Sequence, residues 1–235
     1  NANIDEKSFG GRMGEANDAV MKKYALDYCM SDMARNNHLN NEIYIHDLNS
    51  YAVGMHNCLS VPFDKLLANG FNTRQTDVRP AQSVNTAFQL VAVIFQLQSL
   101  QQFGGVSATH LDWTMIPYVR KSFYKHIKDG LMYMGEPSDY KVYNLHFKEI
   151  RENADVGIEN CDWSNYFTEE FYIPNEVYRY AIDMTEKEVY QAVEGLYHNL
   201  NTLQSRSGNQ LPFTSINYGT CTEPEGRMVT KALLD

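Results

Sequence analysis

Apolar residues recur at helical spacing near the start of the chain and predict a first amphipathic helix. This helix is expected to run over residues 15–35, with Asn17 or Asp18 as its N-cap. Its buried face would carry Val20, Tyr24 and Met30. Cys29 lies on the same face, where a small core residue is the simplest interpretation.

A long uncharged stretch runs from Pro80 to Thr109. It contains two apolar rows at helical spacing, which predict a helix over residues 86–103 that ends at Gly104-Gly105. The rows are Leu90, Val93, Leu97 and Leu100 on one side and Phe88, Val91 and Phe95 on another. A helix with two apolar faces and no charge is expected to be buried on both, by its own domain and by a partner subunit.

The second half of the chain predicts two more helices and an irregular segment between them. One helix begins near Pro117 and ends at Gly130, and its lysines at positions 121, 125 and 128 share one face. Residues 131–180 show little periodicity and are interpreted as an irregular layer or an insertion. A capping-box pattern of Thr185 and Glu188 opens the other helix. Its apolar stripe is Val189, Val193, Leu196, Leu200 and Leu203.

Three short segments are predicted to form strands. They are "NEIYIHDL", with Ile43 and Ile45 pointing inward, "HNCLSVPF", which Pro62 stops, and "QLPFTSINYGT", which a turn at "EPEG" follows. Because these strands alternate with long helices rather than with hairpin loops, the pattern predicts an α/β architecture.

Composition narrows the class of protein. Hydrophobic residues make up 43% of the 235 residues and charged residues 21%, which is typical of a globular chain. The net charge of −9 argues against a nucleic-acid surface. The longest apolar run, "LVAVIF", is too short to cross a bilayer, and no secretory signal pattern opens the chain. The sequence begins without methionine and ends inside a helical pattern, so we expect it to be a piece of a longer protein.

The four cysteines bear on compartment and chemistry. Cys29, Cys58, Cys161 and Cys221 are widely spaced and form no C-x-x-C pair. This spacing argues against a zinc site or a disulfide framework, and it favours a cytoplasmic location.

Two polar clusters could each bind a ligand or could each be purely structural. His46-Asp47, with His38 and His56 nearby, could serve a metal-dependent phosphohydrolase, although a hydrogen-bonded pair at a strand end is the more common case. The lysine face at positions 121, 125 and 128 could receive a phosphate-bearing ligand, although a solvated helix face is favoured.

Two later features also stay open. The stretch "SRSGNQLPFTSINYGT", which contains Arg206, could hold a phosphate or sugar through backbone N–H groups or could simply connect a helix to a strand. Cys221 follows this strand as a second thiol or as an ordinary turn residue.

Cys58 is the least settled of the candidates. A buried structural cysteine is the common case, but its neighbours His56, Asn57 and Ser60 are polar and suit a strand end that faces a ligand. The residues alone leave both interpretations open.

An ordered set of segments resembles one family. The segments are "NANIDE…GR", "YIHDL", "NCLSVPFDKLLANGF", "RPAQSVNTAFQLVAVIFQLQSLQQFGG", "HNLNTLQSRSGNQLPFTSINYGT" and "EGR", and they span Asn1 to Arg227. In this order they resemble the anaerobic (class III) ribonucleoside-triphosphate reductases, which are glycyl radical enzymes.

The resemblance implies a fold and an activity. The fold would be part of a ten-stranded α/β barrel of the ribonucleotide reductase type with long interface helices, and residues 1–235 would be the N-terminal and central part of that one catalytic domain. The activity would be reduction of ribonucleoside triphosphates to deoxynucleotides by a homodimer, with formate as reductant. A radical-SAM iron–sulfur activating protein would install the glycyl radical, which generates a thiyl radical on a loop cysteine.

The resemblance also assigns residues. By its place in "NCLSVPFD", Cys58 resembles the first-strand cysteine that helps reduce the ribose, so it is expected to be catalytic. The expected substrate contacts are His46, His56, Asn57, Ser60, Arg206, Ser215 and Asn217. Residues 83–130 would form the dimer-interface and dNTP effector helices, with Gln89, Gln96, Lys121 and Lys125 as effector contacts. No metal ligand is expected in this chain.

The chain also departs from the family pattern. It contains no arginine–glycine–tyrosine radical motif and no C-x-x-C pair, so the glycyl radical and a structural zinc are expected in a missing C-terminal part, and this piece alone is expected to be inactive. Two alternatives remain: a dNTP-binding regulatory dimer without chemistry, and the metal phosphohydrolase around His46-Asp47.

Overall fold

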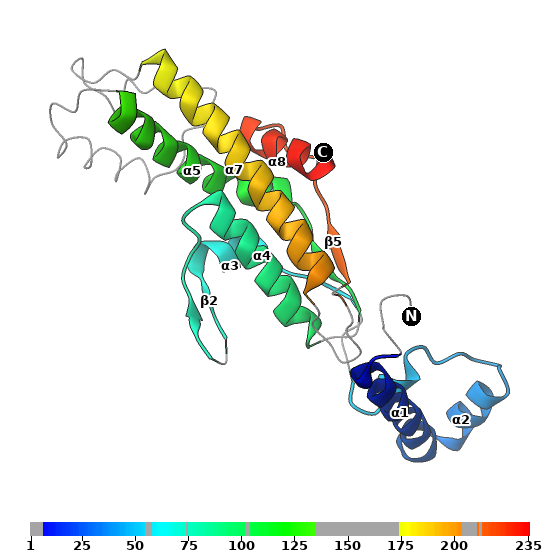
Figure 1. The fold of residues 1–235 in the computed structure, drawn as a ribbon. Coiled ribbons are helices and arrows are strands. Elements are labelled where there is room, and N and C mark those ends of the chain that lie inside the picture. Colours follow the sequence, from blue (N-terminus) through cyan, green and yellow to red (C-terminus); the bar gives the residue numbers. More distant parts are fainter. Residues whose placement is uncertain are drawn as a thin grey trace. The chain divides into compact units, whose positions relative to one another are not determined.

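Long helices and a short parallel sheet make up the fold (Figure 1). The structure is a computed structural model that describes residues 7–54, 58–73, 75–101, 104–134, 174–203, 211 and 213–235. The chain divides into two compact units. One comprises residues 1–59, 95–107 and 200–215, and the other comprises residues 60–94, 108–199 and 216–235. Among the described helices, none combines the length and the apolar character that a membrane span requires.

The sheet consists of β1 (Leu59–Ser60), β4 (Val106–Ala108) and β5 (Thr214–Ile216), in the order β1-β4-β5. Val106 N–H donates to the Phe213 carbonyl at 2.8 Å, and Asn217 N–H donates to the Ala108 carbonyl at 2.9 Å. Since the partners advance together along both strands, β4 and β5 are parallel, and Ser107 lies opposite Ser215. Helices separate these strands along the chain, which confirms the predicted α/β architecture.

The first unit contains α1 (Phe9–Tyr24), the π-helix η1 (Ala25–Cys29), α2 (Asp32–Leu39) and the 3-10 turn η2 (Leu48–Ser50). The prediction of one helix over residues 15–35 is wrong. The backbone becomes extended at Met30, and the Ser31 hydroxyl accepts the Ala34 N–H at 3.2 Å and so caps a new helix.

The predicted core face of this first helix is also wrong. Val20, Tyr24 and Cys29 are exposed. The buried positions of α1 and η1 are Gly11 and Ala25. The buried face is therefore formed by small residues, which a search for large apolar side chains overlooks.

Residues 41–48 form no strand, contrary to the prediction from "NEIYIHDL". Asn41 and Asp47 both adopt left-handed backbone conformations, with φ of 61° and 52°, and these interrupt the extended chain. Ile43 is consequently exposed rather than inward-facing.

The second unit contains most of the long helices. They are α3 (Phe63–Asn69), α4 (Val84–Ser99), α5 (Leu111–Met134), α7 (Asn175–Thr202) and α8 (Pro224–Leu234), although the last residues of α4 and α7 are counted with the first unit. A hairpin of β2 (Phe71–Asn72) and β3 (Asp77–Val78) follows α3. Fully buried side chains of this unit include Val84, Phe88, Met115, Tyr124, Ile127 and Leu196.

Helix α4 has the predicted apolar rows, but it ends at Ser99, so the predicted end at Gly104-Gly105 is wrong. The row of Phe88, Val91 and Phe95 is completely buried. The other row is more open in this chain, since Val93, Leu97 and Leu100 are 38%, 39% and 56% exposed. Burial of one apolar face is thus confirmed, and cover of the other face by a partner subunit stays a prediction.

The limits predicted for the next two helices are wrong. Helix α5 begins six residues before Pro117 and continues through Gly130, where an added Cβ would lie 3.0 Å from side-chain atoms of Val177 and Tyr180. Gly130 therefore permits close packing of α5 on α7 rather than ending a helix.

Helix α7 begins ten residues before the predicted capping box. Thr185 donates to the Ala181 carbonyl at 2.6 Å, and Glu188 pairs with His126, so both residues serve mid-helix contacts. Residues 131–134 and 175–180 are helical, while residues 135–173 of the predicted irregular layer lie outside the described residues.

The segment "EPEG" begins α8 instead of forming a turn, because Pro224 occupies its first position. Helix α8 binds α5 through the fully buried Glu225, whose Oε1 accepts from Arg120 Nε at 2.8 Å. The helical reading of the last residues is confirmed.

Replacing Gly70 by alanine is expected to destabilise the second unit by about 1–3 kcal/mol. Gly70 has φ of 75°, and an added Cβ would lie 2.2 Å from the Val78 carbonyl oxygen, so the hairpin backbone would have to move. Urea unfolding would measure the change. Gly195→Ala is the matched control, because no atom lies within 4 Å of the added Cβ in this helix, and it should stabilise by up to about 1 kcal/mol. Equal effects of the two variants would contradict the expectation.

Candidate functional site

Cys58 lies immediately before β1 and is exposed. Its Sγ accepts the Gly105 N–H at 3.4 Å, and Leu59 N–H donates to the Gly105 carbonyl at 3.1 Å. These bonds hold the thiol beside the first residues of β4. The structure therefore disfavours the interpretation of Cys58 as a buried packing residue.

The thiol lies on the polar face of the sheet. A Cβ added at Gly105 would be 4.0 Å from Cys58 Sγ, which places the sulfur on the side to which side chains at positions 105 and 107 point. Ser107 is on this face and lies opposite Ser215, whereas Val106 is buried on the other face. A thiol and two hydroxyls thus share one face of the sheet.

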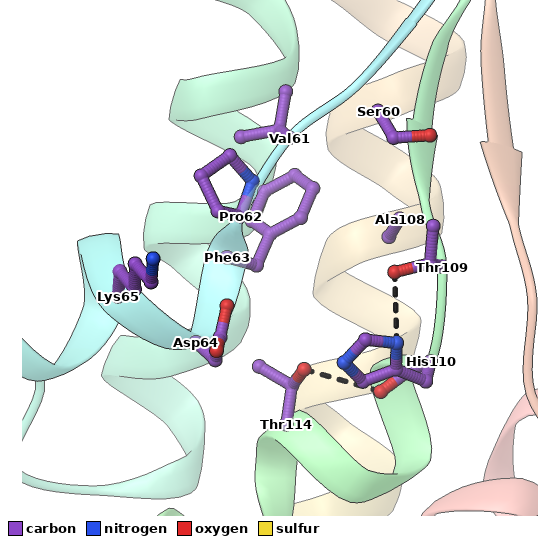
Figure 2. Close-up of a pocket in the computed structure, with 10 residues that line it drawn as sticks. All are labelled: Ser60, Val61, Pro62, Phe63, Asp64, Lys65, Ala108, Thr109, His110 and Thr114. Carbon is purple, nitrogen blue, oxygen red and sulfur yellow. Dashed lines mark hydrogen bonds between the residues drawn. The ribbon is translucent and has the colours of Figure 1, made fainter.

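A cavity of about 300 Å³ lies in the second unit, at the carboxyl ends of β1 and β4 (Figure 2). Its lining residues are Ser60, Val61, Pro62, Phe63, Asp64, Lys65, Ala108, Thr109, His110 and Thr114. The carboxyl edge of parallel strands is the usual place for ligands in α/β proteins. The predicted substrate contact Ser60 lies here.

His110 is held firmly at this cavity. Its Nδ1 lies 2.8 Å from the Thr109 hydroxyl, and its carbonyl accepts the Thr114 hydroxyl at 3.1 Å. Figure 2 shows the His110 ring and the Asp64 carboxylate on opposite sides of the cavity. The arrangement offers hydrogen-bonding groups of both kinds to a polar ligand.

Burial keeps the side chain of Tyr118 neutral. Burial, with a further contribution from the negative charge of Asp64, raises the pKa of Tyr118 to about 12. The ammonium of Lys121 lies 5.2 Å from the centre of this ring and donates to the Ala81 carbonyl at 3.2 Å. Lys121 therefore already binds the backbone just before α4.

The remaining predicted effector contacts lie on α4 and α5. Lys125 is exposed, and Gln89 is exposed with its amide donating to Asn85 Oδ1 at 3.3 Å. The Nε2 atom of Gln96 is buried and has no hydrogen-bond partner among the described residues.

The predicted substrate contacts are only partly brought together. Ser215 shares the polar sheet face with Cys58, whereas Ser60 lines the cavity. Asn217 follows β5, and its carbonyl accepts the Leu111 N–H at 3.0 Å. His56, Asn57 and Arg206 lie outside the described residues.

His46 does not join these groups through any described hydrogen bond. It is exposed, and its Nδ1 lies 2.5 Å from Asp47 Oδ2. His38 Nδ1 instead accepts the Ile45 N–H at 3.2 Å. Within the described ranges, no group of three or more His, Cys, Asp or Glu side chains could hold a metal ion. The pair thus has the geometry of a local hydrogen bond.

Comparison with known proteins shows which family this chain belongs to. The family model described as anaerobic ribonucleoside-triphosphate reductase matches residues 1–235. The chain belongs to this family. It is 28% identical to the anaerobic ribonucleoside-triphosphate reductase of Enterobacteria phage T4 and 26% identical to that of Escherichia coli K12, each over the whole chain. It spans 32% and 27% of the length of these two reductases.

A solved reductase has the same fold. The anaerobic ribonucleotide reductase from Thermotoga maritima, in complex with dATP and CTP, matches 97% of this chain and 33% of its own, with a TM-score of 0.57 and 15% identity. At this identity the match concerns the fold alone. It confirms the predicted fold class, part of an α/β barrel of the ribonucleotide reductase type.

Several polar residues of this reductase chain were missed by sequence reasoning. Thr109 and His110 lie between β4 and helix α5, and Asp112 is the second residue of α5. No role was predicted for them, because the helix was expected to begin only near Pro117. The signal available was their position, since polar residues directly after a strand and before a helix are typical of ligand sites in α/β folds.

A buried polar network in the second unit joins α4, α5 and α7. Val84 N–H donates to the Ser122 hydroxyl at 3.0 Å, and His126 Nε2 lies 2.9 Å from Glu188 Oε2. Burial alone would raise the pKa of Glu188, but the hydrogen bond and charge of His126, the Ser122 hydrogen bond and the charge of Lys125 together lower it.

This pKa shift predicts a pH dependence of stability. A carboxyl whose pKa is lowered by folding stabilises the folded state above its ordinary value of 4.5, and the contribution disappears as the pH falls through the lowered pKa. Glu188→Gln should therefore destabilise the protein at pH 6 and have a smaller effect near the folded pKa. Urea unfolding at several pH values below 6 would measure this. Glu194→Gln, an exposed change on the same helix, should show no such trend. A constant difference for Glu188→Gln would contradict the expectation.

Proposed function

We propose that the longer reductase containing this chain reduces ribonucleoside triphosphates to 2′-deoxyribonucleoside triphosphates, and that Cys58 donates a hydrogen atom to the substrate. The observation that carries the proposal is the exposed Cys58 thiol beside Gly105 on the polar sheet face, in a chain that the reductase family model matches throughout. A packing cysteine would be expected on the apolar face instead.

In the proposed reaction this chain supplies a hydrogen atom from Cys58 and hydrogen bonds to the ribose. The S–H bond of Cys58 breaks and its hydrogen atom forms the new C2′–H bond, while the 2′ C–O bond breaks and the hydroxyl leaves with a proton as water. Formate would return a hydrogen atom to the Cys58 sulfur, pass its second electron to the substrate and leave as carbon dioxide, so that it supplies both electrons of the net reduction. Ser107 and Ser215 lie on the same face and would hydrogen-bond the ribose. A serine at position 58 could not replace the thiol, because an O–H bond is much stronger than an S–H bond.

The initiating radical belongs to chain beyond these residues. A glycyl radical, installed by a radical-SAM activating protein, would start the reaction through a thiyl radical. The sequence contains neither an arginine–glycine–tyrosine motif nor a C-x-x-C pair, and the described residues contain no metal-binding cluster. The residues present therefore do not fit the radical site or the structural zinc, and no step is assigned to them.

The more open row of α4 supports a homodimer with effector sites. Val93, Leu97 and Leu100 would pack on the partner. The Thermotoga maritima reductase was solved with dATP and CTP. By analogy we propose that dNTP effectors contact Gln89, Gln96, Lys121 and Lys125, and that a ribonucleoside triphosphate is the substrate.

The test is an anaerobic assay of the full-length protein. It would be incubated with its activating protein, CTP, formate and dNTP effectors, and dCTP would be separated and quantified. Electron paramagnetic resonance would verify the glycyl radical. Product formation is expected. A verified radical without product from any ribonucleoside triphosphate would contradict the proposal, and dNTP binding without a radical would favour a regulatory dimer.

A further inference from the structure

Asp112, the second residue of α5, is completely buried and receives four backbone N–H groups. Its Oδ2 accepts from Gly219, Thr220 and Cys221 at 2.9, 3.0 and 2.9 Å. Its Oδ1 accepts from Trp113 at 3.0 Å. One carboxylate therefore caps its own helix and binds the segment that follows β5.

The segment is shaped for a negative charge. Gly219 adopts φ of 95°, a left-handed conformation that favours glycine. Consecutive N–H groups that converge in this way form a concave site for an anion, and here the chain's own Asp112 fills it. An asparagine would present an NH₂ group to these donors, because both carboxylate oxygens already accept N–H groups.

Further hydrogen bonds join the same two segments. Asn217 N–H donates to the Ala108 carbonyl at 2.9 Å, and its own carbonyl accepts from Leu111 N–H at 3.0 Å. Trp113 Nε1 donates to the Thr220 hydroxyl at 3.1 Å. The end of β5 is thus fixed to the start of α5 on both sides of Asn217.

Asp112 joins two groups of exposed polar side chains. Asn217 is exposed, so its position is set by its backbone rather than by packing of its side chain. Thr109 and His110 precede Asp112 by three and two residues and line the cavity. The Asp112 side chain is therefore one link between the polar end of β4 and the polar end of β5, beside the backbone bonds of Asn217.

We propose that Asp112 is a positioning residue of the reductase, which holds the end of β5 so that the Asn217 amide reaches the nucleotide. The inference rests on the proposed function and deepens it. Asp112 does not touch the nucleotide, since it is buried and its oxygens are occupied by backbone N–H groups. It acts through Asn217. This indirect action can be tested by comparing the two single variants with the double variant.

The experiment uses the activated full-length reductase and compares Asp112→Asn, Asn217→Ala and the double variant. The kcat and KM for the nucleotide and the melting temperature would be measured for each. Each single change is expected to lower kcat/KM by about 100-fold, the scale of a misplaced substrate contact, and the double variant should be no worse than the more damaged single one. Glu225→Gln is the matched control, since Glu225 is also a fully buried carboxylate. It should lower the melting temperature but leave kcat/KM unchanged while the protein is folded.

A second measurement follows the hydrogen bonds between Asp112 and the segment after β5. Amide hydrogen exchange of Gly219, Thr220 and Cys221 should accelerate in folded Asp112→Asn, and unchanged exchange would overturn the inference. So would unchanged kcat/KM in Asp112→Asn, or losses that multiply in the double variant. An unaltered enzyme that carries its radical but forms no deoxynucleotide would instead overturn the proposed function.

Discussion

Cys58→Ser is expected to lower deoxynucleotide formation by the full-length reductase by at least about 10³-fold, the scale of losing a group that reacts directly. Serine keeps the shape and the hydrogen-bonding capacity toward the Gly105 N–H, but its O–H bond is too strong to give up a hydrogen atom. Because Cys58 is exposed, the change should alter the free energy of unfolding by no more than about 0.5 kcal/mol.

Cys29→Ser is the matched control for this prediction. Cys29 is also an exposed cysteine of the first unit, and it ends the π-helix η1 rather than adjoining a strand. It should retain the activity of the unaltered enzyme. Product formation by Cys58→Ser at the normal rate would reduce Cys58 to a structural residue while leaving the reductase assignment in place. Loss of activity in both variants would indicate damage unrelated to hydrogen transfer.

Arg120→Met is expected to destabilise the second unit by about 3–5 kcal/mol, the cost of removing one partner from a buried ion pair. Glu225 is completely buried, and Arg120 Nε lies 2.8 Å from its Oε1, with Arg120 itself only 14% exposed. Removing the guanidinium leaves the Glu225 charge in a poorly solvated position between α5 and α8. Chemical denaturation would measure the loss.

Two further variants make this second prediction specific. Arg120→Met combined with Glu225→Gln removes both charges and should recover a large part of the lost stability. Lys231→Met removes a far more exposed ion pair, in which Lys231 and Glu186 are 62% and 40% exposed, and should cost no more than about 1 kcal/mol. If Arg120→Met cost no more than Lys231→Met, the buried pair would not have the importance assigned to it.

Sequence reasoning succeeded where the signal was local. Helix α4 was predicted because its two apolar rows and lack of charge lie within one stretch of chain. The strand around Cys58 was placed correctly, although only Leu59 and Ser60 are in β1. The role given to Cys58 came from resemblance to the reductase family, since its polar neighbours alone left packing and chemistry equally open.

Sequence reasoning failed where distant residues decide the structure. The start of α5 depends on Asp112, whose three long-range donors come from residues 219–221, more than a hundred positions later. Pro117 gave a more obvious but incorrect helix start. Likewise, Glu188 resembled part of a helix cap, whereas its partner is His126 on another helix. No local pattern could have indicated either pairing.

The contacts of α5 with residues about a hundred positions later have a consequence for synthesis of the protein on the ribosome. Asp112 and Arg120 are made early, but their partners at residues 219–221 and 225 are made about a hundred residues later. Until those residues emerge, α5 carries a carboxylate and a guanidinium without their native contacts, and burying them would be costly. The second unit should therefore remain unfolded or bound to chaperones during translation and fold only after α8 has been released.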